Sequence, residues 1–398
     1  MIKGYITCVG PLTPLIAALA VVAVCASAQA QVTVSSNNSS ATFNLPGHSA
    51  TGTVEGVSSL LRNTPFAGGV DEIQDVDSQG IGWYLGVDTN LAAEISALGV
   101  TGSDVFSTAG TRVDYSYGAG GTTEVVGSYF LADPPGPTLA PQSDTTGNFH
   151  AALFMGVSVI NNDNVAHTYS LYSFHDLALT DVVSGTGFDA IADERLVVGG
   201  TNTGAGIDNN LITRTDFDST HPLFSQSTIR VIAPGDVNGD LKITLNPDIQ
   251  TVLANNADTV PGSDGVTLPT PITPYEDYLA FGDTNLDGII TLNPDIQITL
   301  ANNAVQRSKP DFVQVHQDNA SLIDGFIKAA TNLNNTTSVD PAGSQTGETL
   351  TSAFQWTFTL QPGETFDVDE LLIVSPEPGS LALLGLGATL LMGRRRRR

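Results

Sequence analysis

Two short stretches of the chain carry oxygen-bearing side chains at alternate positions, a spacing that suits a hard cation. Each has the form Asp-x-Asn-x-Asp, so its first, third and fifth side chains end in carboxylate or amide oxygens. In a tight loop such oxygens converge on one point, as Ca²⁺ requires, and a backbone carbonyl at position 7 (Lys242 or Ile289) would add a further ligand. The expected side-chain ligands are Asp236, Asn238 and Asp240 in the first loop and Asp283, Asn285 and Asp287 in the second.

Both loops belong to an internal repeat. Residues 236–256 recur 47 positions later as residues 283–303, and 15 of the 21 positions are identical. After each loop an asparagine stands at a helix N-cap position and a proline at the first helical position. These pairs are Asn246-Pro247 and Asn293-Pro294. The repeat therefore predicts two units of one loop and one helix, whose apolar faces contain Ile249, Val252 and Leu253 in the first copy and Ile296 and Leu300 in the second.

Two such loops, each leading into one helix, resemble the dockerin module, which binds one calcium ion per EF-hand-like loop. In that family an acidic ligand closes the loop at position 12. Here prolines occupy position 12, and Asp248 and Asp295 fall at position 13. These two acids are either the closing ligands or first-turn acids that interact favourably with the helix dipole. The remaining interpretation is a pair of Asx-turn hairpins without metal.

Two further departures from the dockerin pattern affect the expected calcium affinity of each loop and the expected role of the module. Leu241 replaces the usual glycine at position 6 of the first loop, whereas Gly288 keeps it in the second, so we expect stronger calcium binding in the second loop. Dockerins usually close a chain with a short linker between copies. Here 26 residues (257–282) separate the copies, and strand patterns resume after Arg307. We therefore expect an inserted module that calcium stiffens, rather than one that docks to a cohesin.

The first thirty residues predict export. A positive charge at Lys3 precedes an apolar stretch from Leu12 to Val24, and Ala28 and Ala30 place small residues at −3 and −1 of a cleavage site. This pattern is typical of a secretory signal peptide. Cleavage after Ala30 would leave Gln31 as the first mature residue.

The last 24 residues predict a second processing event. The tripeptide Pro376-Glu377-Pro378 is followed by an apolar run of 13 residues and then five arginines. The run is shorter than the ~20 residues of a permanent membrane helix, and the arginines would stay on the cytoplasmic side. The three parts together resemble the PEP-CTERM sorting signal. That resemblance implies an exosortase-type processing enzyme as a partner, only transient contact with the membrane, and delivery to the envelope surface or extracellular matrix of a Gram-negative-type bacterium.

Composition restricts the chemistry of the mature chain. Both cysteines, Cys8 and Cys25, lie in the signal peptide, which leaves no disulfide and no thiolate site. Residues 31–376 hold forty acidic and nine basic residues, a formal net charge of −31. Such a surface repels nucleic acid and favours cations and solubility. Adaptation to salty surroundings explains the acidity at least as well as any specific partner does.

The remaining sequence predicts a mainly β fold, an antiparallel β-sandwich of jelly-roll-like type. Apolar residues alternate in short runs between turn residues, which is typical of half-buried strands. The expected strands are 81–87, 112–117, 123–131, 152–160, 167–174, 354–360 and 370–374, and the expected short helices are 90–98 and 321–330. The aromatic stripes are expected in the core rather than on a sugar-stacking surface. The body resembles uncharacterised sandwich domains of other sorting-signal proteins, through Trp83-Tyr84, residues 172–177 and residues 354–360.

These patterns divide the chain into five parts. Residues 1–30 are the signal peptide, 31–231 the first part of the sandwich, 232–307 the inserted repeat module, 308–374 the last strands of the sandwich, and 375–398 the sorting signal.

The chain lacks the common catalytic motifs, with no Gly-x-Ser-x-Gly elbow, no His-Glu-x-x-His and no phosphate-binding glycine loop. His175-Asp176 could form a base and its orienting acid, but a pair in a loop is the favoured interpretation. Asp71-Glu72 with Asp75 and Asp77 could supply paired carboxylates for glycoside hydrolysis, against a solvated acidic turn. We therefore expect a non-catalytic surface protein, structural or adhesive, that calcium stabilises. The alternative is a protein that binds or degrades polysaccharide, with exopolysaccharide or another surface protein as its partner.

Overall fold

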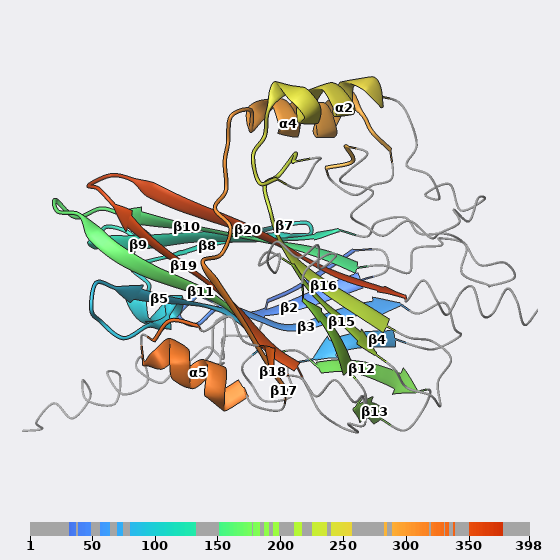
Figure 1. The fold of residues 1–398 in the computed structure, drawn as a ribbon, viewed down its shortest axis with the longest axis horizontal. Coiled ribbons are helices and arrows are strands. Elements are labelled where there is room, and N and C mark those ends of the chain that lie inside the picture. Colours follow the sequence, from blue (N-terminus) through green and yellow to red (C-terminus); the bar gives the residue numbers. More distant parts are fainter. Residues whose placement is uncertain are drawn as a thin grey trace, which may run out of the picture.

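Two β-sheets make up most of the protein. The structure is a computed structural model that describes residues 32–36, 39–48, 56–63, 70–74, 80–132, 151–176, 178–183, 187–190, 194–198, 211–216, 225–236, 240–256, 282–284, 289–317, 320–329, 331–333, 337–338 and 350–376. In this part of the chain one sheet has twelve strands and the other eight (Figure 1). Their long ladders are antiparallel, and a short parallel pairing joins β17 to β18.

The first sheet has the order β13-β12-β4-β3-β5-β11-β19-β17-β18, with β2 beside β3, β1 beside β2, and β6 beside β5. Its strands are β1 Val32–Ser35, β2 Ser39–Asn44, β3 Gly56–Asn63, β4 Val70–Gln74, β5 Gly80–Val87, β6 Ala93–Glu94, β11 His167–Asp176, β12 Ala178–Val183, β13 Gly187–Ala190, β17 Phe312–Gln317, β18 Thr337–Ser338 and β19 Leu350–Leu360.

The second sheet has the order β14-β15-β16-β20-β10-β9-β8-β7. Its strands are β7 Phe106–Ala109, β8 Arg112–Tyr117, β9 Thr123–Ala132, β10 Ala151–Asn161, β14 Glu194–Val198, β15 Leu211–Asp216, β16 Ser225–Ile232 and β20 Thr365–Pro376. The helical elements are η1 Ile95–Leu98, η2 Leu245–Ile249, α2 Gln250–Ala254, η3 Leu292–Ile296, α4 Gln297–Ala301 and α5 Ala320–Lys328.

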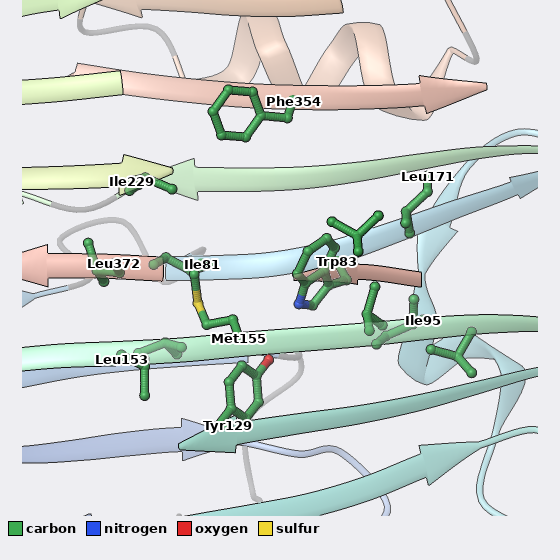
Figure 2. Packing of buried hydrophobic residues seen from close by; sticks show 14 of the residues in the cluster. Ile81, Trp83, Ile95, Tyr129, Leu153, Met155, Leu171, Ile229, Phe354 and Leu372 are labelled. Atoms are coloured by element: carbon green, nitrogen blue, oxygen red, sulfur yellow. The ribbon is translucent and has the colours of Figure 1, made fainter. Parts of the chain in front are cut away.

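The core between the sheets comes from alternate residues of the strands, because successive side chains of a strand point to opposite faces. Val113, Tyr115 and Tyr117 of β8 are all fully buried, and Phe354 and Trp356 of β19 belong to the same buried cluster. The predicted alternation in these strands, and the prediction that the aromatic stripes are core, are confirmed. Figure 2 shows this core, with side chains contributed by both sheets.

Helices cover the outer faces of both sheets (Figure 1). Helix α5 packs on the first sheet through Ile323 and Ile327, which contact a cluster that includes Tyr84 and Phe174. On the second sheet lie the short helices of the repeat, which we call the helix pair (η2 with α2, and η3 with α4). Each sheet therefore packs against a helical element on its outer face through apolar contacts.

Of the two short helices expected in the body, one is confirmed. Residues 320–328 form α5, close to the predicted 321–330. The helix predicted for residues 90–98 is wrong. Ala93 and Glu94 pair instead with β5, which leaves only the 3₁₀ turn Ile95–Leu98, and Gly99 at φ 77° ends it. Hydrogen bonding to a neighbouring strand prevailed over a weak local helix preference.

Candidate functional site

The repeat forms two loop-and-helix units between β16 and β17 of the chain. Each helical element of the second copy begins 47 residues after its counterpart, so nearly the same sequence gives the same local structure twice. The asparagine before each proline has extended dihedrals, at Asn246 (φ −136°, ψ 119°) and Asn293 (φ −138°, ψ 114°), and the following peptide bond is cis. Helical dihedrals thus begin at the proline, as predicted for Asn-Pro.

The two copies pack on each other reciprocally. A Cβ added to Gly235 would lie 2.9 Å from the Cα of Thr299, and one added to Gly282 would lie 2.8 Å from the Cγ2 of Val252. Val252 and Thr299 occupy the same position of the repeat. Each copy therefore presents a glycine, just before its first aspartate, to the helix of the other copy, and the two loops share one small core.

One side of the helix pair rests on the second sheet. Val252, Ile290 and Ile296 form a buried cluster with sheet residues that include Leu371 and Ile373. The prediction that Leu253 and Leu300 belong to this apolar face is wrong. Both remain about half exposed, at 49% and 50%. Ile249 and Val252 take the buried positions of the first copy, and Ile296 and Thr299 take those of the second. Leu253 and Leu300 therefore fall on the outer side of these short helices.

The chain leaving the second copy is tied to the first copy and to β20. The N–H of Ile243 donates to Val305 O at 2.9 Å, and that of Arg307 donates to Leu241 O at 2.8 Å. The Arg307 guanidinium then reaches Asp369 Oδ2 on β20 at 2.7 Å. Burial raises the pKa of Asp369, and the charge and hydrogen bond of Arg307 oppose that rise.

In the first loop the structure describes Asp236 and the residues from Asp240 onward. Asp236, almost fully buried, accepts the N–H of Leu241 with Oδ2 at 2.7 Å. Leu241 has φ +66°, the left-handed conformation for which EF-hand loops use glycine at position 6. That conformation costs a non-glycine residue about 1–2 kcal/mol. The Leu241 side chain is fully buried, which stabilises by about 1.5–3 kcal/mol and offsets the strain.

The other expected ligands of the first loop are placed as follows. Asp240 is exposed and accepts the N–H of Lys242 with Oδ1 at 2.9 Å. Lys242, whose carbonyl was expected as a ligand, forms an isolated bridge with Gln306. Asn238 lies outside the described residues.

In the second loop Asp283 is fully buried and Ile289 is 48% exposed, whereas Asn285 and Asp287 lie outside the described residues. The side chains at positions 1 and 5 offer hard oxygen atoms, which fit calcium in their chemistry. Among the described residues, no group of three or more His, Cys, Asp or Glu side chains is placed to hold a metal ion. The calcium site therefore stays a prediction.

The acids at position 13 are fully buried and turn back towards their own loops. Asp248 Oδ2 accepts the N–H of Thr244 at 2.7 Å, and Asp295 Oδ2 accepts that of Thr291 at 2.8 Å. Asp295 also accepts, with Oδ1, the N–H of Thr284 at 2.8 Å. Sequence reasoning placed these acids as ligands or dipole partners and did not foresee their hydrogen bonds to threonine.

The residues expected for processing lie mostly outside the described part. This holds for Ala28, Ala30, Glu377 and Pro378, whereas Pro376 is the last residue of β20 and is paired with Ser225 of β16. No helix within the described ranges is long and apolar enough to cross a membrane.

The candidate acid–base pair His175-Asp176 lies inside β11 and not in a loop. Both residues are buried, and they make separate contacts. His175 Nε2 lies 2.8 Å from Ser173 Oγ and 3.2 Å from Glu370 Oε2 of the opposite sheet, while Asp176 Oδ1 accepts the Thr351 hydroxyl at 2.9 Å. Asp176 therefore does not orient His175, because neighbours in a strand face opposite sides.

The acidic group expected near residue 71 is also placed differently. Asp71 and Glu72 lie within β4, so the interpretation of this segment as a solvated turn is wrong for these two residues. Strand pairing with β3 and β12 fixes them there. Asp75 and Asp77 are outside the described residues.

A second ionic cluster, which sequence reasoning missed, lies at one end of the sandwich. His167 Nδ1 lies 2.7 Å from Asp88 Oδ2, and its Nε2 lies 2.9 Å from Asp163 Oδ2. The hydrogen bonds to Asp163 and Asp88 raise the pKa of His167. Hydrogen bonds from the Thr168 N–H and from His167 lower the pKa of Asp88, and the bond from His167 lowers that of Asp163.

Comparison of the chain with protein-family models and with curated proteins finds no match.

Proposed function

We propose that this chain is a non-catalytic structural or adhesive protein of a bacterial cell surface or extracellular matrix. The observation that carries this proposal is the burial of a cluster of serine, histidine and glutamate side chains. His175, Ser173 and Glu370 are fully buried between the two sheets, and the aromatic stripes fill the same core. Groups used in this way hold two sheets together, and a polymer substrate does not reach them.

The two ends of the sequence support the delivery part of the proposal. Their patterns resemble a signal peptide and a PEP-CTERM signal read by an exosortase-type enzyme. The intact mass of envelope-associated protein should lack Arg394 to Arg398. Replacing Pro376-Glu377-Pro378 with three alanines should leave unprocessed precursor in the inner membrane. Mature material that retains its full C-terminus would overturn this part.

Calcium is proposed to stabilise the repeat, which is dockerin-like in its sequence. Extracellular sites of this class bind at roughly 10⁻⁴–10⁻³ M. Because ligand binding stabilises by RT ln(1 + [L]/Kd), millimolar calcium would add about 0.4–1.4 kcal/mol per site. We therefore expect a rise in melting temperature of a few degrees, which Asp287→Ala removes for the most part and Asp240→Ala to a smaller extent. Equal melting curves in calcium and in chelator would refute the metal.

The competing function is binding or degradation of polysaccharide, because dockerin-like modules often accompany such activity. A glycan array together with a hydrolysis screen on the full chain separates the two. Binding without turnover would make the protein a matrix adhesin with a defined ligand. Turnover of any polymer would overturn the non-catalytic proposal.

A further inference from the structure

The hydrogen bonds of Asp295 point to a role different from metal ligation. Its Oδ1 accepts the N–H of Thr284 at 2.8 Å and the hydroxyl of Thr284 at 3.0 Å. Its Oδ2 accepts the N–H of Thr291 at 2.8 Å and lies 3.3 Å from the Thr291 hydroxyl, whose proton is shared with Asn293 O at 2.7 Å. Two N–H groups and two hydroxyls thus surround one buried carboxylate.

These donors occupy the positions at which a cation would bind the carboxylate. An ionised carboxylate offers about four lone-pair directions. In Asp295 each oxygen already holds one backbone N–H and faces one hydroxyl. A cation that took these oxygens as a bidentate ligand would displace donors that are themselves buried, and buried donors without an acceptor are unfavourable.

In the first copy, Oδ2 of Asp248 makes the same contacts as Oδ2 of Asp295. Asp248 Oδ2 accepts the N–H of Thr244 at 2.7 Å and lies 3.2 Å from its hydroxyl. In both copies the acid reaches back to the start of its own helix, as the acid of a capping box does. The sequence, however, has Val237 where the second copy has Thr284. The first copy therefore lacks the hydroxyl that bonds to Oδ1 in the second.

We propose that Asp248 and Asp295 are positioning residues, which connect each loop to its helix through buried hydrogen bonds. Neither carboxylate is then a calcium ligand. Asp295 joins positions 2, 9 and 13 of its loop, and Asp248 joins positions 9 and 13. This inference concerns the calcium site and rests on the proposed function in that respect. The calcium ligands would then be the loop residues at positions 1, 3, 5 and 7, together with water. It also means that the loops keep their shape in chelator.

Asp295→Asn tests the proposal, because it changes the hydrogen bonding while preserving the size of the side chain. The amide nitrogen of asparagine donates, so it would face the N–H of either Thr284 or Thr291. The full chain should then melt about 5 °C lower in chelator, where no calcium is bound. The matched variant Asp248→Asn should fall less, because Val237 offers no hydroxyl. Asp240→Asn, at an exposed loop position, should leave the melting temperature in chelator unchanged and reduce the rise that calcium gives.

A second measurement separates a positioning role from a purely structural one. Thr284→Val removes one donor to Asp295, and Thr284→Ser restores it. By calorimetric titration with calcium chloride, the valine variant should bind about tenfold more weakly, the magnitude usual for groups that support a ligand shell, and the serine variant should recover.

The opposite pattern would overturn the proposal. If Asp295 were a ligand, Asp295→Asn would leave the melting temperature in chelator unchanged or raise it, and would abolish the effect of calcium on the second loop. Unchanged calcium affinity in Thr284→Val would show that Asp295 stabilises the fold without positioning the calcium ligands, and would overturn that part of the proposal. If the unaltered chain shows no calcium effect, the calcium function fails, while the loss in chelator still tests the internal hydrogen bonds.

Discussion

Arg307 Nε donates to Asp369 Oδ2 at 2.7 Å, and this bond joins the exit of the helix pair to strand β20. The same guanidinium lies 3.3 Å from Asp367 Oδ2 through Nη1. Both Arg307 and Asp369 are largely buried. The repeat is thus anchored to the sandwich by an ionic contact as well as by its apolar cluster, and a change in the repeat can reach β20.

Arg307→Gln should destabilise the protein by about 1–3 kcal/mol at pH 7, because Asp369 would stay buried without its charged partner. The effect should depend on pH. Burial already raises the pKa of Asp369, and loss of Arg307 raises it further, so the folded variant holds that proton to higher pH than the unfolded chain does. The deficit should therefore be small at and below about pH 3.8, the ordinary value, and should grow as the pH rises through the raised pKa.

Urea unfolding at several pH values measures this effect, and Arg112→Gln is the matched control. Arg112 lies at the same 2.7 Å from Asp114, but its side chain is 53% exposed, so its loss should cost less than about 1 kcal/mol. Equal losses from the two variants would show that Asp369 is not buried as described.

The His167 cluster predicts a stability window in pH. The raised pKa of His167 means that its contribution is complete below about 6.5, the ordinary value, and is lost as the pH rises through the raised pKa. The lowered pKa values of Asp88 and Asp163 mean that their contribution is complete above about 3.8 and is lost as the pH falls through the lowered values. The cluster should therefore contribute most between about pH 3.8 and 6.5.

His167→Gln should reduce the fall in melting temperature between pH 6 and 9. His48→Gln is the control, because His48 Nε2 contacts the Ser116 carbonyl oxygen and no carboxylate in the described part of the chain. A profile that is unchanged in the His167 variant would contradict the assignment of the cluster as a pH-dependent contact.

Local patterns in the sequence predicted the strands well where alternation was strong. Val113, Tyr115 and Tyr117 alternate without interruption, and β8 has the bounds that were expected. The repeat predicted two short helices 47 residues apart, because two nearly identical sequences form nearly the same local structure. Residues 90–98 were misjudged because pairing with β5 depends on a partner that no local pattern reveals.

The contacts between side chains of distant strands could not be predicted from local patterns. His167 meets Asp88 across 79 residues, and the Ser173 hydroxyl meets Glu370 across 197. Such contacts follow from strand order and register, which the alternation of apolar residues alone does not determine. For Asp295 a signal was present, because threonines at positions 2 and 9 of the second loop are suitable donors for a buried acid. The direction in which the Asp295 carboxylate points, towards the threonines of its own loop, was not visible in the sequence.

Replacing one residue of the buried cluster of Ser173, His175 and Glu370 should destabilise the protein more than replacing all three. Glu370→Ala should cost about 3 kcal/mol, since it leaves His175 and the Ser173 hydroxyl buried without their shared acceptor. The triple variant Ser173→Ala, His175→Leu, Glu370→Leu should lose less than Glu370→Ala alone. Removal of the three side chains together leaves none of them facing a lost partner, as for other buried polar networks, although it also ends the 3.4 Å contact of the Ser352 hydroxyl with His175 Nδ1.

Chemical denaturation of the single and triple variants decides this point. Glu364→Ala, which alters an exposed glutamate, should stay within about 0.5 kcal/mol of the unaltered chain. Additive losses in the triple variant would show that the three side chains do not act as one network.

The reciprocal packing of the two copies predicts a pair of sensitive glycines. Gly282→Ala places a Cβ 2.8 Å from the Cγ2 of Val252 at a backbone φ of +98°, and Gly235→Ala meets Thr299 in the same way at +96°. Each change combines an unfavourable backbone conformation with a steric contact, so each should cost well over about 1 kcal/mol. Gly363→Ala is the matched control, with φ +78° and no neighbour within 4 Å. Its loss should be about 1 kcal/mol, the backbone part alone.

A compensating change distinguishes steric contact from backbone strain. Val252→Ala removes the Cγ2 atom that meets the new methyl group, so Gly282→Ala should destabilise less in the Val252→Ala background than in the unaltered chain. Thermal unfolding of the four members of this cycle gives the coupling free energy. A coupling near zero would mean that the added methyl group meets the Val252 backbone, whose Cα lies 3.0 Å away, rather than the end of its side chain. A favourable coupling of about 1 kcal/mol would show that each loop is held by the helix of the other copy, so that a ligand bound in one loop stabilises both.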